Sequence, residues 1–425
     1  MMKIIHNLSV KLASVEIWII TSAVFLSIIY PRALLGVVIL GIFFWFVRRF
    51  TSGRFTVRTP VDISVLVLLL IILINLWVTA IPSKTYPQVC RLLTGVILMY
   101  SIVNWGRTST RLRWLASGVI LATFILALFS MISVEWTQQK LPFIPASLYE
   151  GFILLVKDTI HRNVMAGYLI ILCPVTLGLL LFTWKELRGW NRVLLLIVAC
   201  TVFGILILTQ SRGALVAFCV VLLVLTLLRW KRGWIAIPAS LLVLAGLIAS
   251  LGSDKFLEVL SSGMSLGGLD GRLEVWSRAI YMVQDFPITG VGLGLFGDVA
   301  DNLYPFFLFE PGSVPHAHNL FLQVAVDLGI PGLITWLAIV FIMLGLSWQI
   351  YKIGREKGDN WTTGLGAGLF CSQLALITHG LLDAISWGAV RPVPIVWALW
   401  GLTCAVWIYN QKKQPGSDFV RTRIR

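Results

Sequence analysis

The chain has 425 residues, of which 58% are hydrophobic and only 12% are charged, and its mean hydropathy is +0.89. This composition lies far outside that of soluble globular proteins and disfavours a disordered chain or a nucleic-acid-binding domain. An outer-membrane barrel is also disfavoured, because its strands would alternate apolar and polar residues. The sequence therefore predicts an integral membrane protein, and its formal net charge of +15 first concerns how the chain is oriented in the membrane.

Apolar stretches near the length that crosses a bilayer follow one another along the whole chain. They lie near residues 15–30, 33–48, 61–80, 86–104, 114–133, 163–183, 193–209, 214–229, 234–251, 331–350, 362–382 and 393–410. We expect an all-α fold, a polytopic membrane protein with about 12 transmembrane helices and a large outer loop that contains helices. Residues 1–251 would hold the first nine transmembrane helices, residues 252–330 the large loop, and residues 331–425 the last three and a tail.

The cationic residues predict the orientation. One set of loops holds 23 of the 34 Lys and Arg residues, the opposite set holds ten, and Arg91 lies within a span. Because cytoplasmic loops retain positive charge, both termini are expected in the cytoplasm. Basic clusters such as residues 229–232 sit at span ends on that side, so we interpret them as topology determinants and expect no nucleic-acid partner.

Polar residues concentrate in the two long outer loops, residues 134–162 and 252–330. The longer loop predicts a helix at 269–285, a glycine-rich turn at 290–297, an aromatic stretch at 304–309 and a short helix at 319–328. The cytoplasmic loops are short and lack a GxxxxGK[ST] sequence, which excludes an ATP-driven pump on this chain alone. Function is therefore expected on the outer side.

Arg212 occupies a very short turn between two apolar spans, at the outer membrane interface. A guanidinium there is costly unless it reaches an anionic partner or extends to lipid phosphate. Both interpretations stay open on the sequence alone.

Arg272, Trp276 and Arg278 lie on the predicted helix of the large loop. Arg272 and Trp276 are four residues apart and therefore share one face of that helix. Arg272 is a candidate anion ligand, and a structural pairing with Asp270 or Glu274 fits the spacing equally well.

His316 and His318 stand just before the short helix, on which Asn319, Gln323 and Asp327 recur every four residues as a polar stripe. Two histidines at this spacing, without a cysteine or an HExxH sequence, make a weak metal signal, so no metal and no cofactor are predicted. A helix N-terminus favours an anion, and a histidine suits general-base chemistry at neutral pH. A capping or interfacial role for these histidines is the alternative.

Four further residues are second-rank candidates, together with Trp276, Arg278, His316 and Asn319. They are Arg162 at the entry to a span, His379 and Asp383 near the outer end of the eleventh span, and Arg391 just beyond it. Each of the four also fits an ordinary span-end residue.

Five short motifs, in this order, resemble the O-antigen ligase and polymerase superfamily. They are Ser-Arg-Gly at 211–213, Gly-Arg-x-x-x-Trp at 271–276, Pro-x-x-Gly-Val-Gly-x-Gly at 287–294, His-Asn-x-x-Leu-Gln at 318–323 and Asp-Leu-Gly-Ile-Pro-Gly at 327–332. The motif-bearing similarity covers about residues 160–350, and the number of spans extends the likeness to the whole chain.

The resemblance implies a membrane glycosyltransferase of the GT-C type in the bacterial inner membrane, with its active site facing the periplasm. Such a ligase moves a glycan from undecaprenyl diphosphate onto a sugar hydroxyl of lipid A-core, with inversion and without a metal. Arg212 and Arg272 would hold the donor diphosphate, and His318 would act at the acceptor hydroxyl. Membrane lipids would be further partners. The large loop has no DxD-like acidic pair, although Asp298 and Asp301 lie in it.

Two alternatives remain. A Wzy-type O-antigen or exopolysaccharide polymerase shares the donor and the arginines and differs in the acceptor; the ligase is favoured. A transporter or flippase for lipid-linked glycans would explain many spans and outward cations without catalysis. It predicts ionisable residues near the middle of the membrane, whereas these spans are nearly free of them, with Arg91 as the main exception.

Overall fold

The computed structural model describes residues 2–136, 145, 147–152, 154–156, 159–251, 269–387 and 394–412. Its longer helices are α1 (Met2–Ile29), α2 (Leu34–Ser52), α3 (Asp62–Val78), α4 (Pro82–Trp105), α5 (Ser109–Ser133), α7 (Arg162–Thr183), α8 (Gly189–Thr209), α9 (Arg212–Arg229), α10 (Ala236–Leu251), α12 (Leu269–Asp285), α14 (Leu320–Lys357), α15 (Asn360–Gly380) and α16 (Pro394–Gln411). Short elements are α6 (Ser147–Glu150), α13 (Phe296–Leu303), and the two-residue strands β1 (Val134–Glu135) and β2 (Ile160–His161), which pair in parallel. The expected all-α class is confirmed for the described residues.

Eight of these helices are long and apolar enough to cross a membrane. They are Lys11–Ile29, Pro31–Ser52, Pro82–Trp105, Ser109–Ser133, Arg162–Thr183, Gly189–Thr209, Arg212–Arg229 and Leu320–Lys357. A helix lies within every one of the 12 predicted ranges, and the count of 12 crossings stays a prediction. Apolar side chains such as Ile63 and Trp77 on α3 are exposed, as expected where a helix meets lipid. The chain is a multi-pass membrane protein.

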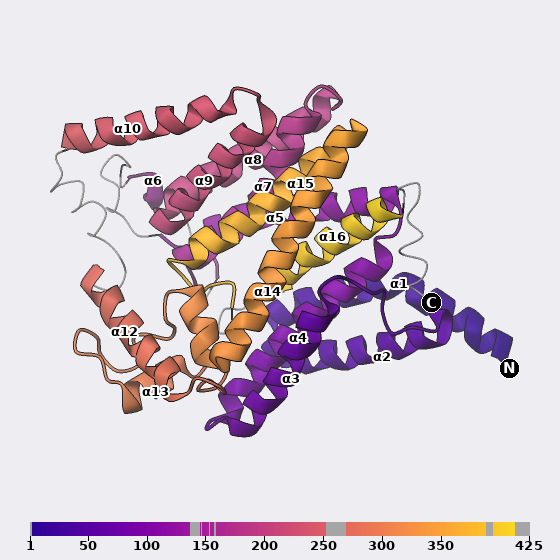
Figure 1. Ribbon diagram of the computed structural model, residues 1–425, viewed down its shortest axis with the longest axis horizontal. Coiled ribbons are helices and arrows are strands. Elements are labelled where there is room, and N and C mark those ends of the chain that lie inside the picture. The colour runs from indigo at the N-terminus through magenta and orange to yellow at the C-terminus, as the bar shows by residue number, and fades with distance from the viewer. Residues whose placement is uncertain are drawn as a thin grey trace.

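Helices α12 and α13 lie together at one end of the helical bundle, away from the start of α1 (Figure 1). The predicted helix at 269–285 is confirmed, and α13 was not predicted, because the glycine-rich turn was expected to run through its first residues. The short helix is also confirmed: it begins at Leu320 and ends at a kink at Gly329. Gly329 has φ 71°, and a Cβ there would lie 2.5 Å from the Ile288 carbonyl oxygen, so glycine is required.

Helices α7 and α15 cross the centre of the bundle in opposite directions and pack closely (Figure 1). A Cβ on Gly178 would lie 2.4 Å from the Gly364 oxygen, and one on Gly368 would lie 2.6 Å from the Pro174 oxygen. Small residues let two helix backbones approach to this extent. At the other end of the pair, a Cβ on Gly167 would lie 2.9 Å from His379 Cε1. The start of α7 therefore lies beside the end of α15.

A buried ion pair joins the first two helices. Arg48 of α2 is 4% exposed and forms a salt bridge with Glu16 of α1. Ser101 of α4 donates a 2.6 Å hydrogen bond to the same carboxylate, and Arg48 Nε donates to the Phe55 carbonyl oxygen at 2.6 Å. Both charges are paired inside the protein, and the ion pair with its hydrogen bond from Ser101 connects α1 and α2 to α4.

Candidate functional site

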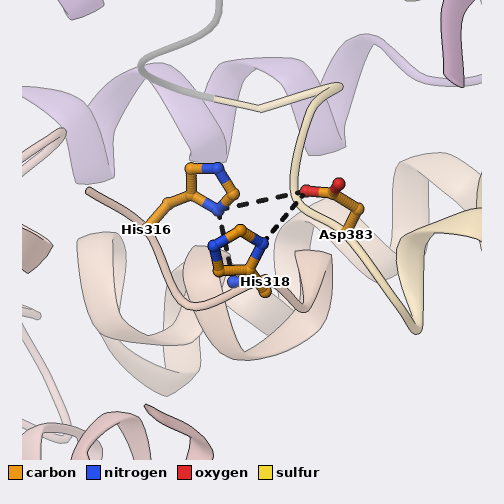
Figure 2. Close-up of side chains that lie close together, drawn as sticks. All are labelled: His316, His318 and Asp383. Atoms are coloured by element: carbon orange, nitrogen blue, oxygen red, sulfur yellow. Dashed lines mark hydrogen bonds and ion pairs between the residues drawn. The ribbon is translucent and has the colours of Figure 1, made fainter. Parts of the chain in front are cut away.

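Two histidines and an aspartate meet at the end of the bundle where α7, α9 and α15 approach α14. His316 and His318 come from the segment before α14, and Asp383 comes from the segment after α15 (Figure 2). Asp383 Oδ1 lies 3.7 Å from His318 Nδ1 and 4.0 Å from His316 Nδ1, and the imidazole centroids are 4.0 Å apart. All three side chains are largely buried. His316 and Asp383 were second-rank candidates in the sequence. In the structure both are direct neighbours of His318.

The backbone around His318 turns sharply to present this cluster. His318 has φ 46°, which is uncommon for a residue other than glycine and is kept only where the surroundings hold it. Its N–H donates to His316 Nδ1 at 3.2 Å. The next residue, Asn319, caps α14 by accepting the N–H groups of Phe321 and Leu322, and its side-chain amide donates to the Leu381 carbonyl oxygen at 3.1 Å. Asn319 therefore connects the two segments of the cluster.

Arg272 reaches this site from α12. Its Nη1 donates a 2.8 Å hydrogen bond to the Leu382 carbonyl oxygen, and its buried Nε has no hydrogen-bond partner in the described part of the chain. The alternative pairing of Arg272 with Glu274 is wrong, because Glu274 lies 3.5 Å from Arg278 and accepts the Phe307 N–H at 2.6 Å. Burial lowers the pKa of Arg272 and nearby Asp383 raises it, so the guanidinium is positioned to accept an anion.

Arg278 and Trp276 lie on the same helix and differ from Arg272. Arg278 pairs with Glu274, donates to the Pro305 carbonyl oxygen at 3.1 Å and lies 5.2 Å from the centre of the Phe307 ring. These contacts occupy the Arg278 guanidinium and hold it against the aromatic stretch at residues 304–309. Trp276 is half-buried, and its indole N–H is a buried donor with no acceptor among the described residues.

Arg212 is the first residue of α9, and its neighbour Gly213 fixes where that helix begins. A Cβ on Gly213 would lie 3.3 Å from Leu382 Cβ and 3.8 Å from His379 Cδ2. Gln210, two residues before Arg212, has φ 50° and donates to the Tyr149 hydroxyl at 2.7 Å. The N-terminus of α9, with Arg212 on it, is therefore held beside the segment that carries Asp383.

Arg162 is the first residue of α7 and is only 5% exposed. Its Nε and Nη1 are buried and have no hydrogen-bond partner within the described ranges. His161, just before it, caps α7 and interacts electrostatically with His318. His379 is buried, and its carbonyl oxygen accepts the Asp383 N–H at 3.0 Å, which shapes the turn that carries the carboxylate. Arg391 lies outside the described residues.

Burial sets the protonation states of the histidines and the aspartate at this site. Burial, with smaller contributions from His316 and Arg272, lowers the pKa of His318 to about 3, and burial likewise lowers that of His316. Burial alone would raise the pKa of Asp383, but the neighbouring imidazoles and the Ala384 N–H lower it. Both histidines are therefore neutral and Asp383 is charged. The Arg272 guanidinium lies beside this carboxylate and keeps a buried Nε–H donor that could bind an anion.

The buried neutral histidines predict a loss of stability in acid. Between pH 3 and 6.5 the unfolded chain binds a proton at position 318 that the folded chain does not, so stability rises with pH up to about 6.5. For His318 alone, the free energy of unfolding is expected to be about 2 kcal/mol lower at pH 5 than at pH 7.5. Unfolding of the purified protein in detergent at both pH values measures this, with His318→Asn as the control. An equal loss in the variant would contradict burial of a neutral His318.

His316, His318 and Asp383 are also a possible metal-ligand set, since their ligand atoms all lie within 4.8 Å of one another. Imidazole nitrogens and a carboxylate suit several divalent ions. The Arg272 guanidinium acts electrostatically on both histidines and would repel a cation at this position. Asp298 and Asp301, the other carboxylates considered, are occupied: Asp298 lies 2.6 Å from Lys84 Nζ, and Asp301 accepts the Gly312 N–H at 2.8 Å.

Comparison with known proteins agrees with the motifs. Residues 194–337 match the family model described as O-Antigen ligase, and this range contains Arg212, Arg272 and His318. The chain is 30% identical over 235 residues to an O-antigen ligase of Pseudomonas aeruginosa, an alignment that covers 54% of this chain and 51% of that protein. It is 26% identical over 167 residues to an O-antigen polymerase of Salmonella muenchen, which covers 38% of this chain and 40% of that protein.

The aligned region spans about half the length of the first relative and less of the second. Residues 194–337, which match the family model, contain the arginine and histidine motifs of α9, α12 and the segment before α14. Residues 194–337 therefore match the O-antigen ligase family model, and the resemblance of the chain to the O-antigen ligase and polymerase superfamily is confirmed.

Proposed function

We propose that this chain is an O-antigen ligase, which transfers a glycan from undecaprenyl diphosphate to a sugar hydroxyl of lipid A-core. The proposal rests mainly on Arg272, which hydrogen-bonds to Leu382 beside Asp383, and on the start of α9, which bears Arg212 and lies next to the same segment. The excess of Lys and Arg on one set of loops supports an inner-membrane orientation with both termini in the cytoplasm. In that orientation the site faces the periplasm, where the lipid-linked donor and the acceptor would meet.

The arginines are suited to hold the donor diphosphate. A guanidinium offers a planar fork of N–H donors that matches phosphate oxygens, and Arg272 uses Nη1 on Leu382 while its Nε is left without a partner among the described residues. Arg212 and Arg162 each occupy the first turn of a helix, where backbone N–H groups and the helix dipole add to the attraction for an anion.

Transfer would proceed by a single displacement at the anomeric carbon. The acceptor hydroxyl oxygen forms the new glycosidic bond as the bond to the diphosphate oxygen breaks, and the lipid diphosphate leaves with the electron pair. The hydroxyl proton passes to the His318 imidazole. Attack on the face opposite the leaving group inverts the anomeric configuration. The arginines stabilise the negative charge that grows on the diphosphate, which is the role a metal ion fills in other glycosyltransferases.

His318 needs the donor in order to act as a base. With a pKa of about 3 in the free protein, the imidazole is a poor proton acceptor. A bound diphosphate beside the ring would favour the imidazolium and raise that pKa. Asp383, 3.7 Å from Nδ1, would stabilise the imidazolium that forms. We therefore expect productive acceptor activation only after the donor is bound.

A polymerase is the second candidate, because one relative of this chain is named an O-antigen polymerase. Both activities would use the same donor, arginines and histidine, and only the acceptor would differ. The higher identity and the longer aligned length belong to the relative named a ligase, which favours the ligase. A flippase would need no base, so it does not explain the His318–Asp383 arrangement.

Reconstitution separates these functions. The purified full chain in liposomes receives undecaprenyl diphosphate-linked glycan in EDTA, together with either lipid A-core or additional donor, and product size is followed on a gel. We expect a single upward shift of lipid A-core in EDTA. A ladder on the carrier lipid would make the chain a polymerase, and no product with either acceptor would favour the flippase.

The EDTA arm also tests the metal assignment. Loss of transfer in EDTA, with recovery on adding a divalent ion, would assign His316, His318 and Asp383 to a metal and overturn their proposed role.

A further inference from the structure

A buried carboxylate that the proposed chemistry does not use lies behind the site. Asp327, on the short first segment of α14, is 0% exposed. Its Oδ2 accepts the Trp387 indole N–H at 2.9 Å, and its Oδ1 accepts the Gln323 side-chain amide at 3.0 Å and the Gly294 N–H at 3.4 Å. A buried carboxylate in a membrane protein is costly unless its acceptor positions are filled, and here they are.

These hydrogen bonds reach both halves of the histidine–aspartate cluster. Gln323 Oε1, on the same side chain that donates to Asp327, accepts the N–H of Ala317 at 2.7 Å. Ala317 is the residue between His316 and His318, and it is 0% exposed. Trp387 ends the described part of the segment that carries Asp383. One carboxylate thus connects two turns that are more than 60 residues apart in the chain.

The Asp327 backbone is anchored as firmly as its side chain. Its carbonyl oxygen accepts the Asn75 side-chain amide of α3 at 2.7 Å, and Asn75 Oδ1 accepts the Leu293 N–H at 3.0 Å. The Val291 N–H donates to the Val326 carbonyl oxygen at 2.8 Å. The glycine-rich turn and α3 therefore hold the Asp327 backbone in place, and this fixes the position of its carboxylate.

We propose that Asp327 is a positioning residue, which sets the spacing between His318 and Asp383 by holding the Ala317 turn through Gln323 and the Asp383 segment through Trp387. The inference rests on the proposed function, because spacing matters only if His318 and Asp383 act together on a proton. His318 keeps a left-handed backbone conformation that its surroundings must impose, and the Gln323–Ala317 hydrogen bond is one such constraint. A displacement of about 1 Å at a reacting group is enough to slow catalysis strongly.

The test removes one hydrogen bond at a time and compares it with an equivalent bond elsewhere. Trp387→Phe deletes the donor to Asp327, and Trp400→Phe deletes a matching 2.9 Å bond from a buried indole N–H to Gln373 Oε1 in the body of the bundle. Trp387→Phe is expected to lower kcat about tenfold with the donor KM within about twofold, since one net hydrogen bond is worth about that factor. Trp400→Phe is expected to keep wild-type kcat at a similar loss of thermal stability.

A second pair of variants gives the rescue readout. Asp327→Asn places an amide N–H against the Trp387 or Gln323 donors, so it is expected to lower kcat more than Trp387→Phe does. Adding Trp387→Phe to Asp327→Asn removes the clash of donors and should recover part of the lost kcat.

Equal kcat values for Trp387→Phe and Trp400→Phe, or a further loss in the double variant, would overturn the positioning role. If Asp327→Asn fails to fold, the two tryptophan variants still decide. Absence of transfer by the wild-type protein with either acceptor would instead overturn the proposed function.

Discussion

Replacing His318 with asparagine is expected to slow glycan transfer about 10²- to 10⁴-fold, the range that a positioned general base contributes. Asparagine keeps a polar side chain of similar reach but cannot take up a proton. The loss is expected in kcat, with the donor KM nearly unchanged, because the arginines that hold the diphosphate stay in place. Single-turnover transfer to lipid A-core measures it.

His316→Asn is the matched control for this prediction. His316 Nδ1 accepts the His318 N–H at 3.2 Å, and an asparagine Oδ1 can accept the same bond, so the backbone turn is retained. We expect a loss of less than about tenfold, below the worth of one net hydrogen bond, because this bond is kept and His316 is not the proposed base. Equal losses for the two variants would show that the histidines work as a unit, and an unchanged rate for His318→Asn would remove His318 from the reaction.

Much of the fold follows from local cues in the sequence. The helix at 269–285 ends as predicted because Pro287 cannot continue it, and the short helix after Asn319 begins at that cap and stops at Gly329. The helix α13 was missed because an eight-residue helix buries only one narrow face, chiefly Phe296 and Ala300, and gives little periodic signal.

Other features depend on pairs of residues that are distant in the sequence. Trp400 of α16, for example, donates a hydrogen bond to Gln373 of α15, 27 residues away in the chain. Arg48 and Glu16, which form a buried ion pair, lie 32 residues apart in the chain. Such pairs leave no local pattern, so hydropathy alone does not settle how many helices cross the membrane.

The candidate site likewise combines residues that local sequence motifs indicate with residues that only the fold brings together. Arg272 and His318 stood out because each lies on the outer side in a recognisable motif, and the structure brings both to the Asp383 segment. Asp383 was a second-rank candidate, because it is distant from His318 in the sequence and no motif joins the two residues. One signal was available: His379 and Asp383 are four residues apart at the outer end of one span, a spacing that places both on the same side.

Replacing Arg272 with glutamine is expected to lower glycan transfer about 10²- to 10³-fold, the cost of losing one preorganised donor to a developing negative charge. Glutamine retains a donor for the Leu382 carbonyl oxygen, so the fold should be unaffected. Because the diphosphate gains charge as the sugar leaves, kcat should fall more than donor binding. Arg272→Lys should recover only part of the rate, since an ammonium is a point charge without the planar fork.

Arg278→Gln is the control for Arg272, because it removes the same charge from the same helix six residues away. Arg278 pairs with Glu274 and lies over the Phe307 ring, and these contacts hold the aromatic stretch and do not involve the Asp383 segment. We expect transfer within about threefold of wild type for this variant. A loss equal to that of Arg272→Gln would mean that the net charge of α12, rather than a fork aimed at the donor, sets the rate. Full activity of Arg272→Gln would remove this arginine from the donor site and leave Arg212 and Arg162 to hold the diphosphate.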